Sequence, residues 1–243
     1  MIKLMQVVFV ILICVNIPSY GQSFEGTLTY VSDIEISEKI AKMGMTKQKL
    51  FDKMKKEGTL SDTIKTSYKL GSYCTYLNNN QKSRSIYNGT TNKIYSLQDG
   101  ESSDICTVID AAIDLEFTMT GKAPTVEKLD TTIAVNGINC NVVRIKWKSG
   151  TYDYYFNSAK LNVTPSLFAK HTYDGWAVFL QFSNALPLKI VKTTKGLVTI
   201  TLTLLAIKQE PIDEKLFSIP NLVSDETLNA VKTPNKEIMR IKK

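Results

Sequence analysis

The chain has 243 residues, of which 43% are apolar and 22% are charged, and its formal net charge is +7. This composition is typical of a globular protein with a real core, and no internal repeat or low-complexity linker divides it. Much of the net positive charge lies in the last dozen residues, where no aromatic residues are interleaved, which argues against nucleic-acid binding.

The first 21 residues have the layout of a cleaved secretory signal. Lys3 supplies the positive start, residues 7–15 form an unbroken apolar run, and Ser19 and Gly21 are small residues at the cleavage site. The apolar run is shorter than the roughly 20 residues that span a bilayer. We therefore expect cleavage after Gly21 and an exported mature chain without a transmembrane span.

The mature chain begins with a predicted strand and two predicted helices. Residues 24–32 alternate with a period of two, which indicates a half-buried strand. Within residues 34–58 the period changes, and Ser37 and Thr46 can each cap a helix. The second helix carries an apolar stripe formed by Leu50, Phe51 and Met54.

Most of the remaining chain reads as short strands separated by turn formers. No alternation of strands with long helices is present, so the pattern predicts an α+β fold with one antiparallel sheet of eight or more strands. Residues 105–119 are ambiguous between strand and helix, and short helices are predicted after Thr164 and Asp174. The predicted strands are residues 63–70, 72–77, 83–87, 93–97, 131–135, 138–147, 151–156, 186–193 and 197–208.

Three cysteines remain in the mature chain, so at most one internal disulfide is possible. Cys106 and Cys140 both lie in extended-looking segments that a hairpin or neighbouring strands could bring together. We predict that they form the disulfide and that Cys74 is the leftover thiol. None of the three has the spacing of metal ligands.

Catalytic patterns are missing from the sequence. The single histidine, His171, is interpreted as a surface or turn residue, because no nucleophile elbow accompanies it. The carboxylates are scattered, and no glycine-rich phosphate loop is present. We therefore predict a protein that is not an enzyme and that uses neither a metal nor another cofactor.

The order of these segments resembles the LolA/LolB-like lipoprotein carriers of the Gram-negative periplasm. It is similar, more closely, to small exported bacterial proteins of unknown function related to that fold, including the GLPGLI-like proteins. The stretches that carry the resemblance are FEGTLTY (24–30), VNGINCNVVRIKW (135–147), YDYYFN (152–157), ALPLKI (185–190) and IDEKLFSIP (212–220).

The resemblance implies a curved half-barrel sheet over residues 22–222 with helices on its concave face, and we expect these to be the helices of residues 34–56. The basic residues near the C-terminus indicate a separate solvated tail at 223–243. In the carriers, the concavity holds lipid acyl chains. A periplasmic or secreted protein that binds a lipid or another apolar small molecule is therefore expected. The candidate lining of such a cavity is Met43, Leu50, Phe51, Met54, Trp147 and Trp176.

A second function stays open. The methionines and their apolar neighbours can equally fill the concave side as core, since methionine suits both roles. The protein would then be a structural or interaction module of the cell envelope that binds another envelope protein.

Overall fold

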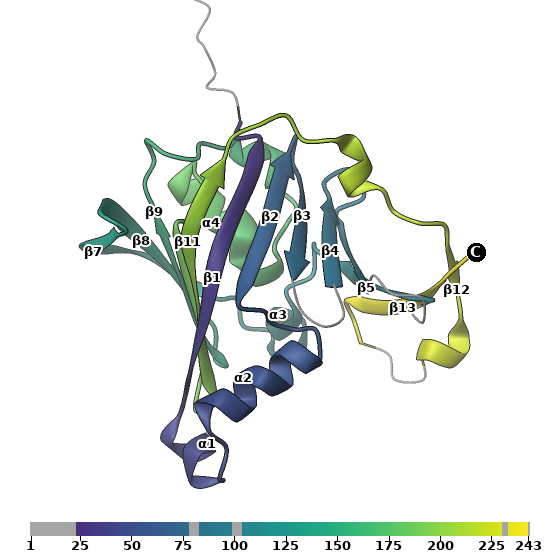
Figure 1. Cartoon of the computed structure of the whole chain (residues 1–243), viewed down its shortest axis with the longest axis horizontal. Coiled ribbons are helices and arrows are strands. Elements are labelled where there is room, and N and C mark those ends of the chain that lie inside the picture. The colour runs from purple at the N-terminus through teal and green to yellow at the C-terminus, as the bar shows by residue number, and fades with distance from the viewer. Residues whose placement is uncertain (1–22, 78–82, 99–103, 230–232, 243) are drawn as a thin grey trace, which may run out of the picture.

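A computed structural model describes residues 23–77, 83–98, 104–229 and 233–242. The predicted signal peptide lies outside these residues. The described chain forms one antiparallel sheet of 13 strands in the order β12-β13-β6-β5-β4-β3-β2-β1-β11-β10-β9-β8-β7. The sheet curves around a short helix (Figure 1), and the predicted antiparallel sheet is confirmed. None of the described helices combines the length and apolar character that crossing a membrane requires.

The first half of the sheet is a run of neighbouring strands connected in sequence order. Each strand pairs with the next along the chain. Short connections between β2 and β6 favour such pairing, whereas two helices lie between β1 and β2. The strands of this half are β1 (Gly26–Ile36), β2 (Thr63–Lys69), β3 (Ser72–Leu77), β4 (Ser83–Asn88), β5 (Lys93–Gln98) and β6 (Ile105–Asp110).

The second half repeats this arrangement and joins the first through β1. The long strands β1 and β11 pair in register from Thr27 opposite Lys208 to Ile36 opposite Val198. The first strand of the chain therefore lies in the middle of the sheet. The strands of the second half are β7 (Thr125–Val135), β8 (Ile138–Lys146), β9 (Gly150–Phe156), β10 (Lys189–Thr194) and β11 (Val198–Lys208).

The C-terminal range predicted as a separate basic tail instead continues the sheet. Strand β13 (Lys236–Ile241) pairs with β6, and β12 (Leu222–Ser224) pairs with β13. The Arg240 guanidinium lies 2.5 Å from the Asp104 carboxylate and 2.7 Å from that of Asp225. At least one of the basic C-terminal residues therefore forms ion pairs within the fold. Met239 and Ile241 of β13 pack on a buried cluster that includes Cys106 and Val108.

The two helices predicted after β1 are present and pack at one end of the sheet. They are α1 (Glu38–Lys42) and α2 (Lys47–Lys56), and the Thr46 hydroxyl accepts the Lys49 N–H at the start of α2. The apolar stripe of α2 packs on a small cluster at the ends of β1 and β2 (Figure 1), whose buried members are Ile34, Leu60 and Ile64.

A different helix packs into the main core. Helix α4 (Trp176–Ser183) is apolar on nearly all sides, which is typical of a buried helix, and its Phe179 and Leu180 are fully buried. Figure 1 shows α4 behind the central strands. The other short helices are α3 (Leu115–Thr120), η1 (Pro165–Phe168), η2 (Tyr173–Gly175), η3 (Glu214–Phe217) and η4 (Glu226–Asn229).

The predicted disulfide between Cys106 and Cys140 is wrong. Both residues are buried free thiols, on β6 and β8, and eight strands lie between these two in the sheet. Neighbouring strands are about 4.8 Å apart, whereas a disulfide needs Cα atoms within about 7 Å. Burial raises the pKa of the Cys106 thiol to about 11 and also raises that of Cys140.

Candidate functional site

The inner face of the sheet lines a cavity of about 350 Å³, which we call the concave cavity. Residues of β1 to β6 and of β9 to β11 line its floor, on the sheet side, and residues of η2, the start of α4 and the loop before them line its opposite wall. This volume lies within the roughly 300–1,000 Å³ typical of ligand sites. Residues of both walls are Thr66, Thr75, Ser85, Ser96, His171 and Trp176.

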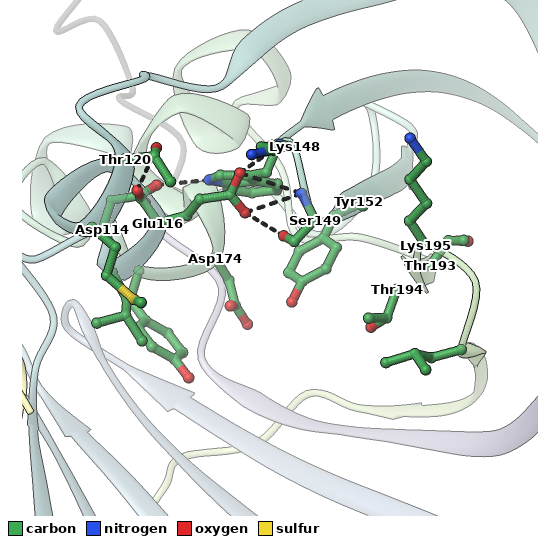
Figure 2. A pocket seen from close by; sticks show the side chains of 16 residues that line it. Asp114, Glu116, Thr120, Lys148, Ser149, Tyr152, Asp174, Thr193, Thr194 and Lys195 are labelled. Atoms are coloured by element: carbon green, nitrogen blue, oxygen red, sulfur yellow. Dashed lines mark hydrogen bonds between the residues drawn. The ribbon is translucent and has the colours of Figure 1, made fainter.

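A second hollow, of about 730 Å³, lies beside α3 where β9 begins and β10 ends (Figure 2). We call it the α3 cleft. It has an apolar part formed by Leu115, Met119, Trp147 and Leu197. Tyr173 and Asp174 line both the α3 cleft and the concave cavity, so the two hollows adjoin.

Side-chain contacts hold α3 against the turn between β8 and β9. The Trp147 indole N–H donates to the Asp114 carboxylate at 2.8 Å, and Asp114 also caps α3 by accepting the Phe117 N–H. The Glu116 carboxylate accepts the backbone N–H groups of Lys148 and Ser149 and the Ser149 hydroxyl (Figure 2). One wall of the α3 cleft is therefore tied to the sheet.

An ion pair stands at the boundary of the two hollows. The Lys192 ammonium lies 2.5 Å from the Asp174 carboxylate and 4.8 Å from the centre of the Tyr152 ring. Burial opposes the charge of Lys192, but Asp174, together with Tyr152 and Tyr173, outweighs this effect and raises the lysine pKa. In Figure 2 the Asp174 carboxylate and the Tyr152 hydroxyl both point toward the open space of the cleft.

The backbone that presents Asp174 is held in an unusual conformation. Asp174 and Gly175 have φ angles of 57° and 70°, in the left-handed region that favours glycine. A Cβ atom on Gly175 would lie 2.4 Å from the Cδ1 atom of Ile145. This close approach fixes the turn that leads into α4 and so positions the wall shared by the two hollows.

His171 lies in the turn between η1 and η2, but it is only 2% exposed and therefore not a surface residue. Its Nε2 atom is 2.8 Å from the Tyr73 hydroxyl, and its ring centre is 4.3 Å from that of Tyr87. Burial lowers the pKa of His171 to about 4, so the ring is neutral at pH 7. Its Nδ1 atom and the Trp176 Nε1 atom are buried without a hydrogen-bond partner among the described residues.

The six residues predicted to line one cavity occupy four different places. Met43 ends α1 and is 74% exposed. Leu50, Phe51 and Met54 pack together at the end of the sheet. Trp147 lines the α3 cleft, whereas Trp176 lines the concave cavity. Only the two tryptophans therefore adjoin the hollows.

Sequence reasoning did not single out the hydroxyl residues on the floor of the concave cavity. The Thr66 and Thr75 oxygens are 3.1 Å apart, and those of Ser85 and Ser96 are 3.2 Å apart. Each of these hydroxyl residues lies near the middle of one of four consecutive short strands. Short turns between such strands place their middle residues opposite one another across the sheet, so the sequence could have indicated this row.

Comparison with known proteins does not assign the chain to a family. No family model matches it, and no curated protein matches it. The solved structure of PNGF-II in space group C2 is similar over 81% of this chain, with 14% sequence identity and a TM-score of 0.42. The chain covers 30% of that structure's chain. A TM-score below 0.5 does not establish a common fold.

Among the described residues, no group of three or more histidine, cysteine, aspartate or glutamate side chains converges as metal ligands do.

Proposed function

We propose that the chain is a non-enzymatic protein of the Gram-negative periplasm that binds or carries a lipid or another apolar ligand. The observation that carries this proposal is the pair of adjoining hollows on the inner side of the sheet, of about 350 and 730 Å³. A carrier needs a concave, largely apolar site with few polar groups, and both hollows offer aromatic and aliphatic walls.

The chemistry of the site supports binding more than catalysis. The pKa of His171, lowered to about 4 by burial, leaves a poor base at neutral pH. The Asp174 carboxylate is engaged by Lys192 at 2.5 Å. Among the described residues, neither group has a hydrogen bond to a serine, threonine or cysteine nucleophile, which a covalent mechanism would require.

A second candidate is an interaction module that binds another envelope protein. The observation that favours it is β7, an 11-residue edge strand with mostly exposed residues, whose outer edge pairs with no strand in the described part of the chain. Such an edge can accept an added strand from a partner. Charged residues and a register shift between Leu129 and Ile133 limit this pairing.

Native mass spectrometry tests the first proposal directly. Mature protein purified gently from the periplasm of its host should carry extra mass that organic extraction identifies as lipid. In a titration with a dansyl-labelled fatty acid, Thr75→Phe should fill the concave cavity and lower the affinity at least about tenfold, or roughly 1.4 kcal/mol.

The matched control is Thr132→Phe, which places the same side chain on the exposed strand β7. Ser96→Phe is a second cavity variant, and only variants with a cooperative melting transition are compared. A ligand-free protein that takes up no fatty acid, or equal affinities for Thr75→Phe and Thr132→Phe, would overturn the carrier proposal. A protein captured through β7 would then identify the interaction module.

A further inference from the structure

A row of hydroxyl residues crosses the inner face of the sheet beneath the concave cavity. Thr66 pairs in register with Thr75, Thr75 with Ser85, Ser85 with Ser96, and Ser96 with Thr107. Residues directly opposite each other on paired strands point to the same face. Five adjacent strands therefore contribute one aligned row, and its first four members line the cavity.

The hydroxyl row has spare hydrogen-bonding capacity. Each hydroxyl has one donor and two acceptor positions. In the Thr66–Thr75 pair, and likewise in the Ser85–Ser96 pair, one hydroxyl donates to the other, so one O–H and several lone pairs remain in each pair. A bare acyl chain placed on this floor would leave these groups unpaired, at a cost in free energy. A group that both donates and accepts hydrogen bonds would satisfy them.

The opposite wall is largely aromatic and includes His171, Tyr173 and Trp176. The Trp176 Nε1 atom and the His171 Nδ1 atom have no hydrogen-bond partner within the described structure, but each has almost no accessible surface and so is not presented to the cavity. The hydroxyl row is therefore the side of the cavity that can hydrogen-bond to a polyhydroxyl group, and the aromatic wall can pack against the other face of that group.

The charge of the cavity argues against an ionised ligand group. Asp174 and Lys192 are the charged side chains among its lining residues in the described chain, and they pair with each other at 2.5 Å. A phosphate or carboxylate would enter without a counter-charge of its own and would lose its hydration. A neutral group with several hydroxyls avoids this cost.

We propose that the concave cavity binds a neutral polyhydroxyl group, of the kind a sugar headgroup carries, while the apolar part of the same ligand lies in the α3 cleft. The ligand class is then a neutral glycolipid. This inference rests on the proposed binding function and specifies which end of the ligand each hollow takes.

Four amphiphiles with the same eight-carbon chain test the inference: octyl glucoside, octanol, octanoate and octyl phosphocholine. Each is titrated below its micellar concentration into the mature protein by isothermal calorimetry. Octyl glucoside should bind at least about tenfold more tightly than the other three, because only its headgroup brings several hydroxyls to the hydroxyl row without an ionised group.

Two conservative variants locate the headgroup. Thr75→Val and Ser96→Ala each remove one hydroxyl of the row, and Thr75→Val does so at nearly constant volume. Each should weaken octyl glucoside binding about 3- to 10-fold, which is typical of one hydrogen bond, and leave octanol binding within about twofold. Thr132→Val on β7 is the matched control and should change neither affinity. Ser85→Ala replaces Thr75→Val if that variant does not unfold cooperatively.

The outcomes separate this inference from the function on which it rests. Equal binding of octyl glucoside and octanol, or equal losses for both in Thr75→Val and Ser96→Ala, would overturn the sugar headgroup and leave an apolar binding site. Tighter binding of octanoate or octyl phosphocholine would overturn it in favour of an ionised headgroup. Binding of none of the four would overturn both proposals.

Discussion

Replacing Phe179 by alanine tests whether α4 is a core helix that fills part of the concave side. Phe179 is fully buried, and its ring stacks on Tyr154 with a centroid distance of 4.5 Å. It also contacts the rings of Phe156 at 6.0 Å and Trp176 at 5.5 Å. Phe182 lies on the same helix but is 49% exposed, so Phe182→Ala is a matched control.

The expected difference between the two variants is large. Truncating a fully buried phenylalanine costs about 3–5 kcal/mol in the free energy of unfolding, through lost burial and the cavity that remains. Truncating the half-exposed Phe182 should cost less than about 1.5 kcal/mol, since half of its surface stays in water in the folded state. In a chain of this size each kcal/mol lowers Tm by about 2–4 °C, so Phe179→Ala should melt roughly 6–20 °C lower.

Urea denaturation of the mature protein measures the effect. The midpoint should fall for Phe179→Ala with an unchanged slope, because the two folded states bury similar surface. Equal costs for Phe179→Ala and Phe182→Ala, within about 0.5 kcal/mol, would refute the placement of α4 in the core.

Two further predictions follow from buried titratable groups. The pKa of His171 is about 6.5 in the unfolded chain and about 4 in the folded protein, so protonation favours the unfolded state as the pH falls. The contribution of the neutral imidazole to the free energy of unfolding is therefore complete above pH 6.5. By pH 5 the native state should lose roughly 2 kcal/mol that His171→Gln does not lose, and parallel urea stability profiles for the two proteins would contradict this. Cys106 and Cys140 should resist iodoacetamide at pH 8 in the folded protein and react in urea without reductant; an intact mass showing a bridge would contradict the structure.

Local features were predictable from the sequence. The expected strand at residues 63–70 corresponds to β2, and that at 197–208 corresponds to β11, because alternation and turn residues act within a few positions. The caps at Ser37 and Thr46 were predicted for the same reason. Residues 105–119 were ambiguous because they contain both β6 and α3, with Asp114 as the helix cap between them.

Features that depend on distant pairing were not predictable. The position of β1 between β2 and β11 decides which cysteines are neighbours, and no local signal specifies it. Basic residues surround Ile238 and Met239, so the sequence indicated a solvated tail and not the strand β13. This strand depends on pairing with β6, which is distant in the sequence. The two tryptophans adjoin the hollows, whereas the stripe of α2 packs elsewhere, since an apolar stripe does not reveal what it will contact.

The position of β1 also determines the order in which the molecule can assemble. Strands β2 to β6 and β7 to β11 each pair with their neighbours in the chain. Most of these pairs are local hairpins, which form quickly, although η1, η2 and α4 lie between β9 and β10. The link between the halves joins positions 162 residues apart, as for Ile36 and Val198. Closing so long a loop is slow, and β1 cannot be paired on both sides until β11 has been synthesised. Until then the chain presents a long unpaired edge at what becomes its centre, where nascent copies are most exposed to mutual aggregation.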